Sequence, residues 1–298
     1  MSKPQARWAI RQWGSRLIGS RLFNAAVASP PVRRLLRPIE HAYVASDVAS
    51  ASAAALRFRD RGFTATFGYW HTDSDTPRAV LDQYLACIRV AAGSDYISAK
   101  IPGLGYSTEL FAELAAAAAQ RGLRIHFDAE EPDTVERSQA FLDRVLAGSP
   151  ARIGWTLPGR WPRSVRDVAW AAERGLRVRV VKGMWAHPEA PDADPRHGYL
   201  QVIEALCRQR IEVAVAGHDI PIIQSALSSL RSAGVACELE LLRGLPWRSQ
   251  LQVARRLGLD ARVYVGYGRD YLKHALAHVL RHPRVMLWIA GDMLRPGR

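Results

Sequence analysis

Eight short runs of strand-forming residues recur along the chain at nearly even spacing, and this repeat limits the folds that the chain can adopt. Their first residues lie 25 to 34 positions apart, which is the length of one strand followed by one helix. The runs are residues 63–67, 96–101, 124–127, 152–156, 177–181, 211–216, 236–241 and 261–265. Because eight such units in series close into a barrel, we predict an α/β fold, a (β/α)8 TIM-like barrel. A doubly wound open sheet is the alternative.

The segments between these runs carry the signals of helix ends. Ser164 and Ser249 are expected to cap helix N-termini, and the pair Asp133 and Glu136 resembles a capping box. Asp219, which is followed by a proline, is expected to start a further helix. Five glycines are expected to end helices, since glycine adopts the left-handed conformation there without strain. They are Gly122, Gly148, Gly175, Gly234 and Gly258.

Composition argues against several classes of protein. The 298 residues are 48% hydrophobic, yet no apolar run approaches the ~20 residues that a membrane-spanning helix needs. Cys87, Cys207 and Cys237 are too widely spaced for a disulfide framework or a zinc site, so we expect a reducing, cytoplasmic location and no metal. The formal charge is +13, but the arginines are spread along the chain. No nucleic-acid partner is therefore expected.

The first 44 residues differ from the rest and are assigned to a separate arm and linker, with the barrel domain spanning 45–298. Residues 7–23 alternate arginines with apolar residues in the pattern of a basic amphipathic helix. Such a helix could lie on an anionic membrane surface, as a peripheral contact, or pack across one end of the barrel.

In a barrel of this class the functional residues lie at the carboxyl ends of the strands. Only four of the 41 lysines and arginines are lysine, and two of the four, Lys100 and Lys182, fall at predicted strand ends. A lysine is a compact charge with a tunable pKa, which makes both candidate functional residues. The other strand-end residues are Gly68, Tyr69, Asp128, Glu130, Glu131, Arg160, Trp185, His218, Asp219, Arg243, Tyr264 and Tyr267.

Five motifs at these strand ends resemble the proline dehydrogenase family, whose members are flavin-dependent (β/α)8 barrels that oxidise proline to pyrroline-5-carboxylate. The motifs are IHFDAEE at 125–131, RVVKGMW at 179–185, AVAGHD at 214–219, ELELLRG at 238–244 and RVYVGYGRDY at 262–271. The resemblance covers about residues 45 to 290. It implies an FAD-dependent enzyme acting on a CH–NH bond, with quinone or another electron acceptor as a partner.

The resemblance also implies roles for individual residues. Lys100, Asp128 and Tyr264 would act at the substrate, and Trp185 and Leu242 would wall its pocket. The residues that would hold FAD are Arg179, Lys182, Gly183 and His218. A lysine Schiff-base aldolase is a remote alternative, because it would need Lys100 or Lys182 to be buried and neutral.

One departure from the family concerns the substrate. In the family the last helix covers the barrel mouth, and a pair of arginines in its Tyr-x-x-Arg-Arg-x-x-Glu pattern clamps the carboxylate of proline. Here the stretch HALAHVLR supplies His274, Ala277, His278 and Arg281 instead. Without a guanidinium fork the carboxylate loses a bidentate contact, so we expect an amine substrate other than free proline, with His278 as a candidate contact.

A second departure is Pro158, which replaces a glutamine that contacts the flavin in the family. Because of these departures, two alternatives to a flavoenzyme that oxidises another amine stay open. The chain could be a non-catalytic barrel used for binding or assembly, or an ordinary proline dehydrogenase whose carboxylate contacts have moved to Arg269 or Arg281. His274, His278 and His282 share one helix face, but a packing or surface role is favoured over metal binding.

Overall fold

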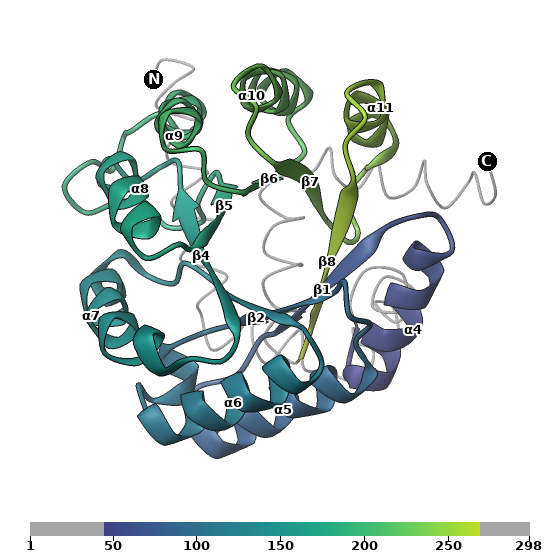
Figure 1. Ribbon diagram of the computed structural model, residues 1–298, viewed down its shortest axis with the longest axis vertical. Coiled ribbons are helices and arrows are strands. Elements are labelled where there is room, and N and C mark those ends of the chain that lie inside the picture. The colour runs from purple at the N-terminus through teal and green to yellow at the C-terminus, as the bar shows by residue number, and fades with distance from the viewer. Residues whose placement is uncertain (1–44, 269–298) are drawn as a thin grey trace, which may run out of the picture.

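Eight parallel strands pair edge to edge in chain order, and β8 pairs with β1, so the sheet closes on itself (Figure 1). The computed structural model describes residues 45–268. The closed sheet confirms the predicted (β/α)8 barrel and excludes the open doubly wound sheet. The strands are β1 Thr64–Tyr69, β2 Tyr96–Ala99, β3 Arg124–Phe127, β4 Arg152–Pro158, β5 Arg177–Val181, β6 Val213–Ala216, β7 Cys237–Leu242 and β8 Ala261–Tyr267.

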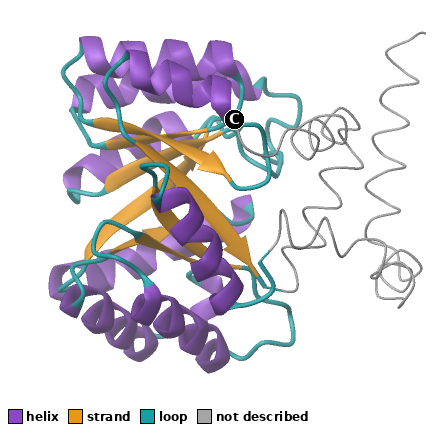
Figure 2. Cartoon of the chain, turned by 90° about the vertical axis from the view of Figure 1, so that its right-hand side faces the viewer, coloured by secondary structure: helices purple, strands orange, loops and turns teal. Residues whose placement is uncertain are grey.

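Helices surround the barrel and cover the outward face of every strand (Figure 2). The outward residues of the strands are apolar and buried, as in Ile97, Ile125 and Val178. Burial of these side chains between helix and sheet supplies the main hydrophobic core. The helices are α4 Val48–Arg59, α5 Pro77–Val90, α6 Thr108–Gln120, α7 Val135–Val145, α8 Ser164–Glu173, α9 Pro195–Gln209, α10 Ile220–Ser232 and α11 Arg248–Arg256. Short 3-10 turns lie at Pro102–Leu104, Pro132–Thr134 and Leu146–Gly148.

Several predicted helix caps are wrong. Ser164 is already inside α8, and its hydroxyl donates to the carbonyl of Pro158 at 2.7 Å. Ser249 lies inside α11, and Asp133 lies in a 3-10 turn before α7. Asp219 is the residue before α10, which confirms the predicted helix start, although its side chain makes no cap and pairs with Lys182 and Arg196. In each case a tertiary partner or a shifted helix start outweighs the local signal.

Four of the five helix-ending glycines have the expected left-handed conformation. Their φ angles lie between +62° and +69° at Gly122, Gly175, Gly234 and Gly258. The exception is Gly148, because α7 ends earlier and the chain continues as the 3-10 turn Leu146–Gly148.

The inside of the barrel is polar, whereas bulky branched side chains usually fill such a barrel. Inward side chains form two charged layers. The lower charged layer, near the amino ends of the strands, consists of Arg124, Arg177, Glu212, Glu238 and Arg262, and its Glu212 side chain is 43% exposed.

The upper charged layer lies toward the carboxyl ends of the strands and consists of Lys100, Asp128, Glu130, Arg179 and Glu240. Buried charges are costly unless they are paired, and every member of both layers has an ion-pair partner. The strand pattern therefore brings charged groups together inside the barrel instead of aliphatic ones.

The amino-terminal arm and linker, residues 1–44, and the last predicted helix lie outside the described residues, as does the whole of 269–298. The predicted division into arm and barrel domain stays a prediction. Within residues 45–268, every helix is too short or too polar to cross a bilayer.

Candidate active site

Lys100 lies directly after β2 and is enclosed by acidic and aromatic side chains. Its side chain is 5% exposed, and its Nζ lies 3.1 Å from Asp128 and 2.9 Å from Glu130. The same nitrogen stands 4.4 Å from the ring centroid of Trp70, a cation–π contact. Burial alone would lower the pKa of Lys100, but Glu130 and Asp128 outweigh burial and hold that pKa well above its ordinary value. Lys100 is therefore a fixed cation, which argues against the Schiff-base aldolase.

Asp128 follows β3 and is the centre of the cluster. It accepts hydrogen bonds from Ser98 Oγ at 2.6 Å and from Tyr264 Oη at 3.2 Å, and it forms ion pairs with Lys100 and Arg179. Burial alone would raise the pKa of Asp128, but Lys100, Arg179 and the Ser98 bond together hold the pKa below its ordinary value. The carboxylate is therefore charged at neutral pH and can orient the groups around it.

Arg179 points inward from β5 and is 4% exposed in its side chain. Its guanidinium pairs with Asp128 and with Glu240 at 3.1 Å, and it donates to Ser98 and Thr156 at 3.0 to 3.2 Å. These bonds connect the strand ends of β2, β3, β4, β5 and β7. Arg179 thus positions Asp128, and its predicted contact with the cofactor stays a prediction.

Tyr264 on β8 crosses the barrel toward Asp128 because β1 offers it space. An ideal Cβ at Gly68 would lie 2.0 Å from Tyr264 Oη, so a larger residue would overlap the phenol. Burial raises the pKa of Tyr264, with Asp128 adding to the effect, so the hydroxyl keeps its proton and donates it in the hydrogen bond. The absence of a side chain at Gly68 is therefore part of the site.

A group of cations lies at the ends of β4, β5 and β6. Lys182, 40% exposed, and Arg196, 64% exposed, share one carboxylate, Asp219, at 2.8 and 2.6 Å. Arg160 donates to the carbonyl of Met184 at 3.3 Å, and its buried Nε finds no hydrogen-bond partner among the described residues. This rim cluster, Arg160, Lys182, Arg196 and Asp219, therefore has more positive than negative charge.

Gly183 and Pro158 bring the loops after β4 and β5 together beneath this rim cluster. Gly183 has φ +91°, and an ideal Cβ there would lie 2.9 Å from Pro158 Cβ and 3.2 Å from Arg160 Cβ. Pro158 is buried at the end of β4. A residue other than glycine at 183 would force the two loops apart.

His218, predicted as a flavin contact, bridges the loops after β6 and β7. Its Nε2 accepts from the Leu242 amide at 2.9 Å, and its Nδ1 lies 2.8 Å from the carbonyl of Pro246. These contacts assign the proton to Nδ1, since a carbonyl can only accept. Trp185 is half-buried, and its carbonyl accepts from Trp161 Nε1 at 2.9 Å. His218 and Leu242 are thus held together, while the predicted pocket roles of Leu242 and Trp185 stay predictions.

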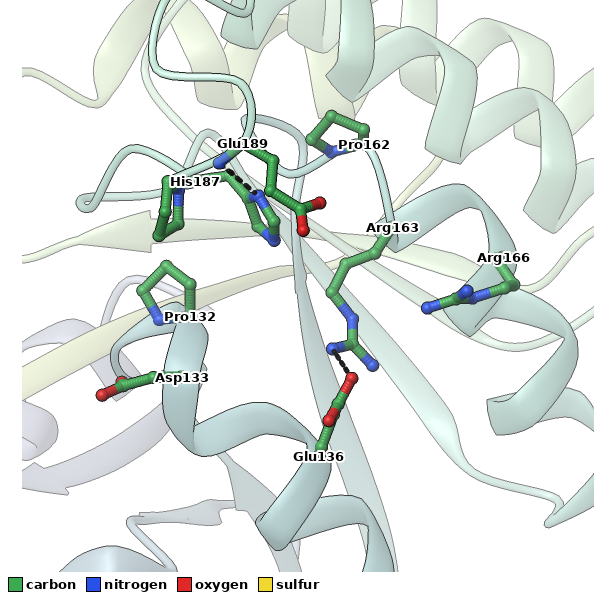
Figure 3. Close-up of a pocket in the computed structure, with 9 residues that line it drawn as sticks. Pro132, Asp133, Glu136, Pro162, Arg163, Arg166, His187 and Glu189 are labelled. Carbon is green, nitrogen blue, oxygen red and sulfur yellow. Dashed lines mark hydrogen bonds and ion pairs between the residues drawn. The ribbon is translucent and has the colours of Figure 1, made fainter.

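A cavity of about 650 Å³ lies on the carboxyl-terminal side of the barrel, between the loops after β3, β4 and β5 (Figure 3). Three prolines and charged side chains of both signs line it, and across it Arg163 lies 3.6 Å from Glu136. Figure 3 shows His187 and Glu189 on the opposite wall from Glu136. None of the predicted site residues that fall within 45–268 lines this cavity.

Known proteins with a similar sequence or structure provide a comparison. The chain is 26% identical over 223 residues to the proline dehydrogenase of Deinococcus radiodurans, a match that covers 69% of this chain and 72% of that protein. The sequence is therefore similar, though distantly, to that of a proline dehydrogenase. A search of family models found no match.

Solved structures of proline utilization A (PutA) have the same fold. PutA from Bdellovibrio bacteriovorus, inactivated by N-propargylglycine, superposes with a TM-score of 0.70 at 13% identity over 83% of this chain. PutA from Corynebacterium freiburgense superposes with a TM-score of 0.68 at 16% identity over 96% of this chain. The chain spans about a third of the length of these two proteins.

Three residues predicted from their strand-end positions form the centre of this cluster, but the side chains that support them were not predicted. Lys100, Asp128 and Tyr264 meet in one cluster, as their strand-end positions predict. The supporting residues that the sequence analysis gave no role are Trp70, Ser98, Arg196 and Glu240, together with Glu130, named only as a strand-end residue. Ser98 and Glu240 could have been found from strand alternation, because they lie two residues before the predicted site residues Lys100 and Leu242. Trp70 and Arg196 lie outside the strands and gave no such signal.

The predicted contacts from the last helix cannot be placed. His274, Ala277, His278 and Arg281 all lie outside the described residues. Their roles in substrate binding stay predictions.

Replacing Gly68 with alanine is expected to destabilise the protein by about 1–3 kcal/mol, because the new methyl group overlaps the buried phenol of Tyr264. The displaced hydroxyl also loses its bond to Asp128. Urea denaturation measures the effect. Gly148→Ala is the matched control, since an ideal Cβ there meets nothing within 4 Å. Equal midpoints for the two variants would contradict the role of Gly68.

Proposed function

We propose that this protein is an FAD-dependent dehydrogenase that oxidises the C–N bond of an amine other than free proline. The single observation that supports this best is the buried cluster of Lys100, Asp128, Arg179 and Tyr264 at the ends of strands in a proline dehydrogenase-like barrel. Perturbed, tightly coupled ionisable groups at the mouth of such a barrel are typical of an active site.

The rim cluster fits the diphosphate of FAD. Lys182, Arg196 and Arg160 provide three positive charges, and Asp219 is the carboxylate that two of them share. The rim cluster therefore has a formal charge of +2, which matches the two negative charges of a diphosphate. The buried Nε of Arg160 offers a hydrogen-bond donor that no described residue uses. We assign Lys182, Arg196 and Arg160 to this role, with Gly183 allowing the loops to approach.

The upper charged layer suits a cationic substrate. Lys100 and Arg179 face three carboxylates, those of Asp128, Glu130 and Glu240, so the layer has a formal charge of −1. An ammonium group balances this charge, whereas a free carboxylate would add to it. When bound, FAD supplies the acceptor for a hydride from the carbon next to nitrogen. Asp128 and its partners orient the amine and exclude water from it.

The substrate follows from the residues that stand where the family has its arginine pair. Ala277 cannot bind a carboxylate, and His278 offers at best one charge-assisted bond. Lys100 does not replace them, because Asp128 and Glu130 already neutralise it. An amine whose carboxyl group is absent, esterified or attached to a carrier is therefore the favoured substrate class.

The proposal is tested by adding FAD to the purified full chain and titrating it anaerobically with proline, proline amide and pyrrolidine. The protein should become yellow, and the flavin band should bleach faster with the two compounds that lack a free carboxylate. Lys182→Met should weaken FAD binding about tenfold, the loss of one charge-assisted contact.

Any other result of this titration would favour one of the alternative functions. Faster bleaching by proline would indicate an ordinary proline dehydrogenase with relocated carboxylate contacts. Bound FAD that no amine bleaches would indicate the binding barrel that Pro158 motivates. A protein that takes up no FAD would contradict the flavoenzyme altogether. We also propose that quinone is the electron acceptor and that the protein reaches it by docking residues 7–23 on a membrane surface. The test is binding to anionic vesicles: the full chain should bind them, and a variant that lacks residues 7–23 should not.

A further inference from the structure

The lower charged layer has more positive than negative charge. Three guanidiniums share two carboxylates in a continuous chain, in which Glu238 pairs with Arg262 and Arg177, and Glu212 pairs with Arg177 and Arg124. The formal charge is therefore +1. Glu240 forms its ion pair with Arg179 in the upper charged layer, and it acts on the lower layer only at longer range, by raising the pKa of Arg177.

Several buried polar atoms in and directly above this layer have no hydrogen-bond partner among the described residues. They are Nη1 of Arg177, Nε of Arg124, both ring nitrogens of His126 and Oγ1 of Thr66. The residues are 2%, 9%, 1% and 0% exposed, and the unpartnered atoms themselves are buried. Unpartnered buried polar atoms are costly, and a concentration of them in one place indicates a ligand.

Strand register shows that these residues are neighbours. Arg177 pairs in register with Gly154, and an ideal Cβ at Gly154 would lie 2.2 Å from Nδ1 of His126, so the imidazole fills the space above that glycine. Thr66 pairs in register with Tyr96, whose ring centroid lies 4.8 Å from the Arg177 guanidinium carbon. The Arg124 guanidinium carbon lies 5.6 Å from the same centroid.

The unpartnered atoms are mostly donors. The two arginine atoms can only donate, and the Thr66 hydroxyl can do so. Burial lowers the pKa of His126 well below its ordinary value, and Arg179, Arg177, Arg124 and Arg262 lower it further, so its ring is neutral and has one N–H donor. Donors and surplus positive charge together call for an anion.

We propose that the barrel interior binds one small monovalent anion of the halide class, held by the N–H groups of Arg124, Arg177 and His126 and the hydroxyl of Thr66. The anion balances the charge of the lower layer and satisfies its free donors. It is a structural ligand, separate from the amine site, because the upper charged layer lies between it and the barrel mouth.

Thermal unfolding of the full chain tests this. Samples are refolded from urea in sodium chloride, bromide or gluconate at one ionic strength and without FAD. A ligand that binds only the folded state raises Tm in proportion to the logarithm of its concentration. We expect a higher Tm in chloride and bromide than in gluconate, which is too large for the site.

Two variants assign the effect to this site. Thr66→Val and His126→Leu should each raise the halide concentration that gives the half-maximal shift at least tenfold, and Ser138→Ala, a buried hydroxyl on α7, should leave it unchanged. If a variant does not fold, anomalous diffraction from crystals of the wild-type protein refolded in bromide tests the site directly. A bromide peak is expected within about 3.5 Å of Nη1 of Arg177. Water density there, or a Tm that does not depend on the halide, would overturn the proposal.

Discussion

Arg179→Met is expected to lower the free energy of unfolding by about 3–5 kcal/mol, the cost of leaving a buried carboxylate without its partner. Glu240 is 2% exposed, and Arg179 supplies its ion pair in the upper charged layer. Asp128 is less affected, because it keeps Lys100, Ser98 and Tyr264. Urea denaturation at neutral pH measures the loss.

The double variant Arg179→Met with Glu240→Leu separates charge from packing. Removing both members of a buried pair is often nearly neutral, so the double variant should recover most of the loss. Arg196→Met is the surface control, because its ion pair with Asp219 is 64% exposed on the arginine side and Lys182 remains on that carboxylate. A double variant as unstable as Arg179→Met would show that packing of the guanidinium, not its charge, stabilises the layer.

Lys100→Met is expected to have the second largest effect, again about 3–5 kcal/mol at neutral pH, because Asp128 and Glu130 lose a shared cation. The loss should depend on pH. The pKa of Asp128 is below its ordinary value in the folded protein, so its contribution to stability is present above about pH 4 and is lost as pH falls through the folded pKa. The pKa of Lys100 is raised, so its contribution is present below about pH 10 and is lost as pH rises through the folded pKa.

The difference between wild type and Lys100→Met should therefore be greatest from about pH 5 to pH 10 and should shrink in acid, where Asp128 takes up a proton. Denaturation curves at several pH values measure it. Lys182→Met is the matched control, the same change at another strand end, where a 40% exposed side chain leaves Asp219 paired with Arg196. It should cost at most about 1 kcal/mol at any pH. A cost of Lys100→Met that stays constant from pH 3 to pH 8 would contradict this account of the cluster.

Much of the fold was predictable because it depends on periodic features. Strand starts recur at the length of one βα unit, and all eight predicted runs overlap the observed strands, with starts shifted by at most two residues, as at Val213. The cap residues were less predictable. Ser164 has the side chain of an N-cap, but its hydroxyl binds a carbonyl of the preceding loop instead. An N-cap hydrogen bond stabilises a helix by about 1 kcal/mol, so a tertiary contact can easily outweigh it.

The candidate site was predictable as far as its residues lie at strand ends. Lys100, Asp128 and Tyr264 come from β2, β3 and β8, and barrel closure alone brings them together. Arg196 reaches Asp219 from the first turn of α9, and that contact depends on the path of a long loop which no spacing rule describes. His218 lies after β6 as expected, but the sequence did not predict its contacts. Both of its ring nitrogens bind backbone groups, the carbonyl of Pro246 and the amide of Leu242.

The pairing of β8 with β1 has a consequence for how the polypeptide acquires its structure. Arg262 donates to the carbonyls of Ala65 and Ser94, which lie 197 and 168 residues earlier in the chain. Native contacts of such large sequence separation make folding slow, since the entropy of closing a long loop is lost before those contacts form. During synthesis, the first strand must therefore wait for the eighth to leave the ribosome, and its unpaired edge is a site for aggregation until then.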